Sequence, residues 1–275
     1  MSALRLGLLG TGIAHSLSPR LHRAGLAALE LEGDYRLYDA PDTDAARAVI
    51  DRVRSGEIDG LNVTTPFKRL ARACCDRALG PAPVNTLWRD GSGVLVGASS
   101  DGPGFCAALR ARGVTIAGAR VAIVGTGGAA EAVALGLRDA GALVVGVVGR
   151  NAPVCAALAG ALGAHALGWS EPLPAAVDLL VHATRIGHGG HADTSPLAAL
   201  DPSCWTDTTA VVDLVYAADG ATPVERYAEA LGARVLGGIG AEMLAAQAAI
   251  SLGWWTGREP PFQAMRAALS TTRST

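Results

Sequence analysis

Lysine is almost absent from this sequence, which contains one lysine, Lys68, and twenty-two arginines in 275 residues. Asparagine and glutamine are nearly as scarce, with three and two residues respectively. Arginine therefore meets the general need for positive charge, and the remaining lysine is a candidate for a task that arginine cannot perform. Proton transfer is such a task, because guanidinium stays charged at ordinary pH whereas an amine can titrate. From scarcity alone, an exposed helix lysine remains the alternative.

Long apolar runs, an excess of charge and paired cysteines are also missing. No uninterrupted apolar stretch reaches the roughly 18 residues of a membrane span, and Gly10 interrupts the first apolar run too early for a signal peptide. The net charge of −2 provides no basic field for nucleic acid or an anionic membrane. Five cysteines without CxxC spacing predict reduced thiols and a cytoplasmic protein, with neither disulfides nor a zinc site.

What the chain does contain predicts a globular α/β protein. Half of its residues are apolar, 50%, and 35 are glycine, a composition that suits many tight turns between strands and helices. A chain of this length can bury a full core and form one large or two medium domains.

The N-terminal region alternates short apolar runs with helical patterns. The expected elements are a strand at 4–9, a helix at 20–31, a strand at 35–38, a helix at 43–55, a strand at 58–63 and a helix at 69–77. Strands that alternate with helices are expected to be parallel. Lys68 then lies just past the C-terminal end of a strand, at the edge where open α/β sheets bind ligands.

The start of the expected helix at 20–31 has two interpretations. Pro19 suits the first helical turn, with Ser18 as the N-cap. Alternatively, the hydroxyls and free N–H groups at this helix start form an anion site suited to a carboxylate. Gly10-Thr11-Gly12 nearby lacks a third glycine, so it is weak as a dinucleotide fingerprint.

Asp101 is a second candidate for the site of Lys68. Strands are expected at 83–88 and 93–98, and Asp101 follows the second of them among glycines. An ordinary turn or helix-capping aspartate is the alternative to a functional one. A helix expected at 105–112 then links two domains.

A strand, glycine turn, helix and strand begin at residue 121 and predict a dinucleotide-binding unit. The strands are expected at 121–124 and 143–148, with the turn Gly125–Ala132 opening the helix between them. The glycines let the backbone approach a pyrophosphate, which faces the free N–H groups of the helix. Arg150 after the second strand, with no acid nearby, favours NADP over NAD, because arginine pairs with a 2′-phosphate.

The C-terminal part continues the alternation of strands and helices. Strands are expected at 177–182, 210–216 and 234–236, and helices at 224–231 and 241–252, the last stopped by residues 254–257. His182, His188 and His191 match no zinc spacing, so no metal site is expected. Gln247 lies among alanines, and a buried glutamine without a partner is costly. It is therefore expected either to meet a polar ligand or to cap the backbone.

With these segments placed, the chain resembles the shikimate dehydrogenases over nearly its whole length. The matching segments follow the family order: His15–Pro19, Asn62–Lys68, Pro83–Thr86, Gly97–Asp101, Gly125–Ala132, Asp213–Tyr216, Gly240, Met243–Leu244, Gln247 and Trp255–Gly257. Each segment is weak evidence alone. Together, in the right order and spacing, they are highly specific.

The resemblance implies an N-terminal α/β substrate domain and a C-terminal Rossmann domain, with the active site in the cleft between them. The domains would be 1–104 with 241–275, and 105–240. It implies Lys68 and Asp101 as the catalytic pair. Substrate would be bound by Ser16 and Ser18 at its carboxylate and by Thr64, Asn85, Asp101, Tyr216 and Gln247 at its ring hydroxyls. The cofactor would be lined by Gly125, Thr126, Gly127, Gly128, Ala129, Gly149, Arg150, Asn151, Leu214 and Gly240.

The chain departs from the family pattern beside these residues. Ser99 and Ser100 replace an Asn-Thr pair, His182 replaces an asparagine, and Arg185 is bulky for its position. A basic residue that often follows the 2′-phosphate arginine is missing near Val154, which keeps NAD as an alternative to NADP. The interval from Lys68 to Asn85 is also a few residues short.

The leading hypothesis is reversible NADP-dependent reduction of 3-dehydroshikimate to shikimate, by a monomer or homodimer acting on a small ring hydroxy acid. The alternatives are a dehydrogenase for quinate or an aminoshikimate, and a non-catalytic sensor of a nucleotide or ring acid. The departures motivate both alternatives. Retention of Lys68 with Asp101 argues against the sensor, which has no use for a titratable amine.

Overall fold

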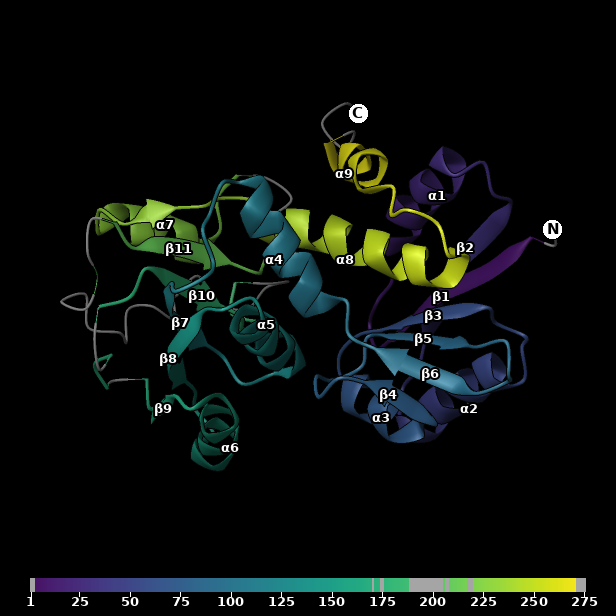
Figure 1. The fold of residues 1–275 in the computed structure, drawn as a ribbon, viewed down its shortest axis with the longest axis horizontal. Coiled ribbons are helices and arrows are strands. Elements are labelled where there is room, and N and C mark those ends of the chain that lie inside the picture. The colour runs from purple at the N-terminus through teal and green to yellow at the C-terminus, as the bar shows by residue number, and fades with distance from the viewer. Residues whose placement is uncertain are drawn as a thin grey trace. The chain divides into compact units, whose positions relative to one another are not determined.

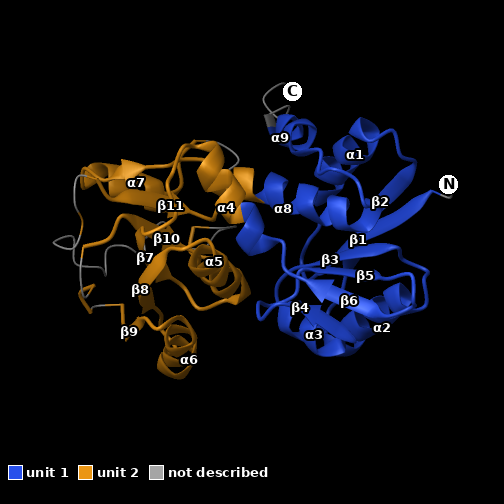
Figure 2. Ribbon diagram, viewed as in Figure 1, with its two compact units in different colours: residues 1–104, 244–275 blue, residues 105–243 orange. Residues whose placement is uncertain are grey.

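The computed structural model describes residues 3–169, 171–173, 176–187, 205, 208–216 and 220–270. The chain divides into two compact units, coloured separately in Figure 2. Unit 1 comprises Met1–Gly104 and Leu244–Thr275, and unit 2 comprises Phe105–Met243. The chain enters unit 2 inside helix α4 (Asp101–Ala111) and returns to unit 1 inside helix α8 (Ile239–Thr256). The N-terminal unit is therefore completed by the C-terminal end of the chain.

In the described part of unit 1, six strands form one sheet in the order β2-β1-β3-β5-β6-β4. Strands β1, β2 and β3 are parallel to one another, whereas β5 is antiparallel to β3 and β6. The parallel direction expected for the first three strands is confirmed, and the sheet as a whole is mixed. The bounds are β1 (Leu4–Gly10), β2 (Gly33–Asp39), β3 (Gly60–Val63), β4 (Arg77–Leu79), β5 (Thr86–Arg89) and β6 (Leu95–Ala98).

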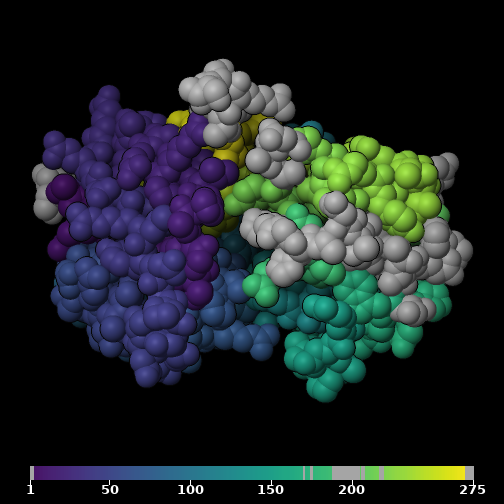
Figure 3. Space-filling view, turned by 180° about the vertical axis from the view of Figure 1, so that it is seen from behind, coloured from purple at the N-terminus to yellow at the C-terminus, as the bar shows by residue number. Residues whose placement is uncertain are grey.

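Helices cover both faces of this sheet, as Figure 1 shows. They are α1 (Ser18–Ala28), α2 (Thr43–Arg54), α3 (Lys68–Cys74), α9 (Phe262–Ser270) and the C-terminal part of α8. Leu6 and Leu8 of β1 pack with apolar residues of α1, α8 and α9, whereas Leu9 packs with those of α2 and α3. Successive strand side chains point to opposite faces, so a strand covered on both sides has a continuous apolar sequence. In the space-filling view, the visible face of unit 1 is formed by its N-terminal elements, in purple and blue (Figure 3).

Unit 2 contains a second sheet, in which the described strands have the order β12-β11-β10-β7-β8-β9. All five neighbouring pairs are parallel. The first strand, β7, lies between β8 and β10, so the strand order reverses there, as in doubly wound folds. The bounds are β7 (Arg120–Val124), β8 (Leu143–Val148), β9 (His165–Leu167), β10 (Leu179–His182), β11 (Ala210–Asp213) and β12 (Arg234–Val235).

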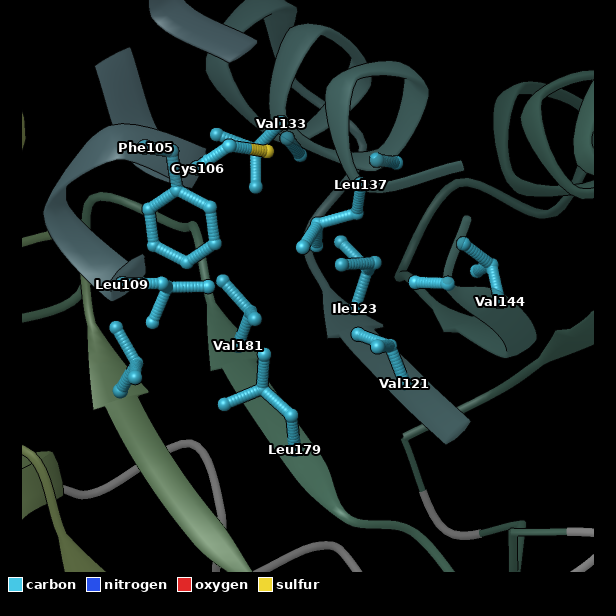
Figure 4. Packing of buried hydrophobic residues seen from close by; sticks show 14 of the residues in the cluster. Phe105, Cys106, Leu109, Val121, Ile123, Val133, Leu137, Val144, Leu179 and Val181 are labelled. Carbon is cyan, nitrogen blue, oxygen red and sulfur yellow. The ribbon is translucent and has the colours of Figure 1, made fainter. Parts of the chain in front are cut away.

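The core of unit 2 shows the same alternation. Val121 and Ile123 of β7 pack beneath α4 and α5 (Gly128–Asp139), with Phe105 and Leu137 among their partners (Figure 4). Ala122 belongs to the other cluster, which includes residues of α7 (Pro223–Ala230). Both faces of the sheet are therefore buried. The remaining helix of the described unit is α6 (Ala152–Leu162).

Most expected elements are present within a few residues of their predicted bounds, but several boundaries were wrong. Helix α4 begins at Asp101, not at Phe105, and α8 begins at Ile239 and continues through both tryptophans to Thr256. Gly257, with φ of 65°, follows its end, because a left-handed residue terminates a helix and glycine adopts it without strain. The expected elements omitted β4, α6 and β9, and residue 77 belongs to β4 rather than to a helix.

None of the helices described here is both long enough and apolar enough to cross a membrane.

Candidate active site

The topology of unit 1 brings three chain segments together at one edge of its sheet. Thr86, the first residue of β5, pairs with Asn62 near the end of β3 and with Ala98 at the end of β6. The end of β3, the start of β5 and the end of β6 therefore meet. Residues just outside these strand ends include Lys68, Asn85 and Asp101, which are far apart in the sequence.

Lys68 and Asp101 form an ion pair at this edge. The Nζ atom of Lys68 lies 2.5 Å from Oδ2 of Asp101, and the two side chains are 13% and 7% exposed. Each is the first residue of a helix, α3 and α4 respectively. A carboxylate in the first turn of a helix is favoured by the helix dipole, which helps to hold Asp101 as an acceptor for the amine.

Asn85 holds the other side of the Asp101 carboxylate. Its buried Nδ2 donates to Oδ1 of Asp101 at 2.9 Å and to the Ser100 hydroxyl at 3.0 Å, with Gln247 Oε1 at 3.3 Å. Its Oδ1 accepts from the backbone N–H of Ser100 at 2.8 Å. The orientation of Asp101 toward Lys68 is thus fixed by the Asn85 side chain, which comes from another segment of the chain.

Hydrogen bonds extend from Asn85 into the interior of unit 1. Gln247 donates from Nε2 to the Leu244 carbonyl at 2.9 Å and accepts at Oε1 from Asn85 and from the Ser100 hydroxyl. One helical turn later, the hydroxyl of Ser251 lies 3.1 Å from that of Ser100 and 2.8 Å from that of Thr86. Gln247 therefore bonds the backbone of its own helix and two polar side chains of unit 1, and its contact with a polar ligand stays a prediction.

The interior end of this network consists of Asn62 and Tyr35. Asn62 donates from Nδ2 to the hydroxyls of Ser251 and Thr86 and to the Asn85 carbonyl, at 3.0–3.2 Å. The Tyr35 hydroxyl donates to Asn62 Oδ1 at 2.9 Å. Burial raises the pKa of Tyr35 well above its usual value, which keeps the hydroxyl protonated as a donor.

Sequence reasoning missed Thr86 and Ser251 as members of this network. Both are buried, and neither was assigned a role from the sequence. The spacing of four residues between Gln247 and Ser251 places them on one face of a helix, and this signal was available. Ser100, noted only as a departure from the family pattern, contributes its hydroxyl to the network. Ser99 does not, since its buried Oγ has no hydrogen-bond partner among the described residues.

His22 is a further buried polar side chain in unit 1. It is fully buried and stacks on the ring of Tyr35, with centroids 4.2 Å apart and an interplanar angle of 7°. Neither ring nitrogen has a hydrogen-bond partner among the described residues. Burial lowers the pKa of His22 to about 3, because the charged form would lose its hydration. His22 is therefore a neutral residue of the core at ordinary pH.

Ser16, Ser18 and Thr64 lie in unit 1 near strand ends. The prediction that Ser18 is the N-cap of α1 is wrong: the N-cap is Leu17, and Ser18 is the first helical residue, with Pro19 next. Ser18 instead donates its backbone N–H to the hydroxyl of Ser16 at 3.2 Å. Pro19 is compatible with this earlier start because a proline in the first turn has no intrahelical N–H to contribute. Thr64 directly follows β3 and is half-buried.

The glycine turn of unit 2 connects β7 to α5. At Gly125, φ is 129°, and a Cβ atom would lie 2.7 Å from the carbonyl oxygen of Ala183. Only glycine allows this approach. Gly127 is the N-cap of α5 and has no side-chain cap, and a Cβ there would meet no atom within 4 Å. Gly128 and Ala129 form the first turn of the helix, next to Thr126. An open, uncapped helix N-terminus of this kind fits an anionic dinucleotide.

The segments after β8 and β11 also border this edge of the sheet in unit 2. Gly149 allows close approach to Thr126, since a Cβ would lie 2.6 Å from the Thr126 methyl carbon. Arg150 is exposed and forms no ion pair with any acidic residue of the described chain. Asn151 accepts the Val154 N–H and is thereby the N-cap of α6. Gly240 allows close approach to the Leu214 carbonyl.

Tyr216 completes the predicted set of site residues, and His182 is the departure from the family pattern in this unit. Tyr216 lies three residues past the end of β11 and is half-buried, and burial raises its pKa. His182, at the end of β10, is fully buried and lies 2.7 Å from Oδ1 of Asp213. His188 and His191 fall outside the described residues. Within the described ranges, no group of three or more His, Cys, Asp or Glu residues is arranged to hold a metal ion.

A parallel sheet with a glycine turn at its switch point is typical of the dinucleotide-binding half of dehydrogenases, and a paired amine and carboxylate suits their acid–base chemistry. The fold and the site therefore define an NAD(P)-dependent dehydrogenase. Comparison with known proteins narrows the class. The family model of the shikimate dehydrogenase substrate binding domain matches residues 8–86, and that of the shikimate 5′-dehydrogenase C-terminal domain matches residues 240–269.

Whole-chain relatives agree with these matches. A shikimate dehydrogenase (NADP(+)) of Halobacterium salinarum is 38% identical over 96% of this chain and 97% of its own length. A shikimate 5-dehydrogenase of Thermus thermophilus, solved with NADP(H) and shikimate, is 35% identical with a TM-score of 0.80, covering 98% of this chain and 99% of that one. A quinate dehydrogenase of Corynebacterium glutamicum, solved with NAD, is 28% identical with a TM-score of 0.80, covering 98% of this chain and 99% of that one. The chain belongs to the shikimate dehydrogenase family.

Proposed function

We propose that this protein is an NADP-dependent shikimate dehydrogenase, which interconverts 3-dehydroshikimate and shikimate. The observation that carries the proposal is the ion pair of Lys68 and Asp101, held by Asn85 at the sheet edge of unit 1. The proposal is further supported by family membership and by relatives that are NADP-dependent shikimate dehydrogenases over nearly the full chain.

Lys68 supplies the proton in this reaction. NADPH, when bound, supplies the hydride that reduces the ring carbonyl to an alcohol. The carbonyl oxygen then needs one proton, which the Lys68 ammonium holds at Nζ. In the reverse direction, the amine accepts the hydroxyl proton. Asp101 acts with Lys68 by holding the amine in place and accepting from a neighbouring ring hydroxyl, and its own orientation depends on the hydrogen bond from Asn85.

The substrate would be oriented by polar side chains. In our proposal, the hydroxyls of Ser16 and Ser18 hold the ring carboxylate, at the start of α1 where the helix dipole favours an anion. Ring hydroxyls would be held by Thr64, Asn85, Gln247 and Tyr216. The amides of Asn85 and Gln247 already bond to each other and to Ser100, so they are preorganised for this role.

The cofactor would be held by unit 2. Its pyrophosphate suits the turn from Gly125 to Ala129, with open space beside Gly127. Gly149, Asn151, Leu214 and Gly240 border the same edge. Arg150 is exposed, has no ionic partner in the described chain and would pair with the 2′-phosphate that distinguishes NADP from NAD.

A change in absorbance at 340 nm provides the test. The purified protein is incubated with NADP+ or NAD+ and with shikimate or quinate, at equal concentrations. The proposal requires reduction of NADP+ with shikimate to be the fastest combination. Faster reduction with quinate would instead identify the protein as a quinate dehydrogenase. The substitutions that motivate this alternative are Ser99 and Ser100 beside Asp101. Tight binding of both ligands without any reduction would indicate a sensor.

We also propose that the protein acts in the cytoplasm, as a monomer or homodimer. The four cysteines in the described part of the chain are all free, which agrees with a reducing compartment. Light scattering during gel filtration measures the oligomeric state. Reaction of the purified native protein with a thiol reagent tests for reduced cysteines, and disulfides in freshly isolated protein would contradict the assignment.

A further inference from the structure

A fully buried histidine–aspartate pair connects two strand ends in unit 2. His182 is the last residue of β10 and Asp213 is the last residue of β11, and both are 1% exposed or less. Nδ1 of His182 lies 2.7 Å from Oδ1 of Asp213, and Nε2 lies 2.6 Å from the hydroxyl of Thr184. The ring therefore joins a strand end to a neighbouring strand end and to the loop that follows its own strand.

The bonds continue from both ends of the pair into the loops. The Thr184 hydroxyl also accepts the N–H of Ile186 at 3.1 Å. Asp213 accepts the N–H of Val215 at Oδ1 and the Thr222 hydroxyl at Oδ2, at 2.9 and 2.6 Å. Thr222 is the N-cap of α7. Three segments (the loop after β10, the loop after β11 and the start of α7) thus depend on one buried ring and one carboxylate.

These loops touch the segments proposed to hold the dinucleotide. A Cβ at Gly125 would lie 2.7 Å from the Ala183 carbonyl oxygen and 3.3 Å from the Thr184 methyl carbon. A Cβ at Gly240 would lie 2.6 Å from the Leu214 carbonyl oxygen and 3.0 Å from that of Asp213. Both glycines are therefore in van der Waals contact with backbone that follows His182 or Asp213.

We infer that His182 is a positioning residue for dinucleotide binding, which acts through Asp213 and Thr184 to fix the backbone against Gly125 and Gly240. The inference rests on the proposed function, because it takes a dinucleotide as the ligand of this turn. An asparagine, which the family resemblance implies at this position, has a shorter side chain, so its amide would not reach both Asp213 and Thr184 without a shift of the backbone. The buried ring gives this chain a connection between the two loops that an amide does not provide.

The test is the affinity for NADP+ measured directly by isothermal titration calorimetry, without turnover. His182→Asn keeps a polar group beside Asp213 but removes the bond to Thr184. We expect its NADP+ dissociation constant to rise by about 10- to 100-fold, because the buried hydroxyl of Thr184 would lose its hydrogen-bond partner and no longer hold the loop. The Michaelis constant for shikimate should change much less.

Thr209→Val is the matched control. Thr209 is also fully buried, and its hydroxyl donates to the Val177 carbonyl at 2.7 Å, but it lies next to the opposite end of β11. The control should lower the unfolding temperature and leave the NADP+ dissociation constant unchanged. If the control and His182→Asn weakened NADP+ binding equally, His182 would contribute only to general stability, and the inference would be overturned. An unchanged NADP+ affinity in a folded His182→Asn protein would also overturn it.

A second pair of variants applies if His182→Asn does not fold. Thr184→Ser retains the hydroxyl that bonds Nε2, whereas Thr184→Val removes it with little change in shape. We expect only the valine variant to bind NADP+ more weakly, and equal affinities would contradict the inference. If the wild-type protein binds NADP+ but oxidises no ring acid, the proposed function is wrong. The NADP+ affinities of the variants still test the positioning role of His182 in that case.

Discussion

The two sheets of this protein use the same edge in different ways. In unit 1, the strand ends carry side chains: an amine, three carboxamides, a carboxylate and several hydroxyls form one hydrogen-bonded group around Asn85. In unit 2, the corresponding edge is bordered by glycines, and carbonyl oxygens come within 2.6–2.7 Å of where their Cβ atoms would be. One site is built from side-chain chemistry and the other from backbone shape.

This difference determines which substitutions each unit tolerates. A side-chain site loses function when a functional group is removed, although the fold survives. A backbone site fails when a group is added, because a new Cβ atom meets main chain that cannot move aside easily. His182 and Asp213 are the exception in unit 2, since their side chains fix the backbone of its loops. The following predictions test the contrast.

The largest effect is expected at Lys68. Lys68→Ala should lower kcat with shikimate by about 10²–10⁴-fold, the usual contribution of a positioned acid–base group. Lys68→Arg keeps the charge but cannot exchange the proton, so it should lose nearly as much activity. Steady-state kinetics measure both, and circular dichroism checks that the variants fold. Near-normal turnover by Lys68→Arg would show that charge alone is required.

Adding one methyl group to the glycine turn should separate folding from binding. Gly125→Ala forces a left-handed φ and a clash with the Ala183 carbonyl, so we expect unfolding to become easier by about 3 kcal/mol or more. Gly127→Ala has an ordinary φ of −78° and open space. It should leave stability within about 0.5 kcal/mol and weaken NADP+ binding. Urea unfolding and calorimetry distinguish the two, and equal stabilities would contradict the backbone account of this turn.

Arg150 should decide between the two dinucleotides. Arg150→Ala removes the cation proposed to pair with the 2′-phosphate, so the Michaelis constant for NADP+ should rise by about 10- to 100-fold, as expected for one charge-assisted pair. The constant for NAD+, which lacks this phosphate, should stay nearly unchanged. Initial rates with each dinucleotide provide the measurement. A similar rise in both Michaelis constants would indicate that Arg150 contacts a part of the cofactor that NADP+ and NAD+ share.

The smallest effect concerns the stability of unit 1 in mild acid. The pKa of His22 is lowered by burial to about 3, so below about pH 6.5 the unfolded chain binds a proton that the folded chain does not. Above that pH, the protonation of this residue does not reduce the free energy of unfolding. Below it, the free energy of unfolding falls by on the order of 1 kcal/mol per pH unit. His22→Phe keeps an aromatic ring beside Tyr35 and should flatten this loss between about pH 7 and about pH 5.

Urea unfolding at several pH values measures this slope. His15→Gln serves as the control, because His15 is exposed, and its slope should match that of the wild type. The same slope in His22→Phe as in the wild type would show that other groups account for the acid sensitivity.

Local patterns in the sequence were sufficient for much of the fold. The apolar runs at β1, β7 and β8 and the glycine turn before α5 were recognisable because strand and helix periodicities are local. The boundary of α4 was misplaced because Gly102-Pro103-Gly104 looked like a turn, whereas proline is compatible with a first helical turn. Strands β4 and β9 are three residues each. They were missed because so short a strand depends on its neighbours in the sheet.

The site was partly predictable in the same way. Lys68 was singled out by its rarity and by its position after a strand, and Gln247 by its isolation among alanines. Ser251 gave only its helical spacing from Gln247 as a signal. Thr86 gave none, because threonine is common and its role comes from partners at distant positions in the chain. The contact of His182 with Asp213 depends on the pairing of β10 with β11, which sequence periodicity does not specify.

The sequence by itself determined the alternation of strands and helices, the glycine turn, the single lysine and the family to which the chain belongs. These properties depend on residue type and near neighbours. Only the tertiary structure decided that Lys68, Asn85 and Asp101 meet, that Ser251 joins them, and that His182 bonds Asp213. Such contacts arise when strand order and register bring remote segments to one edge, and register is set by packing of the whole sheet.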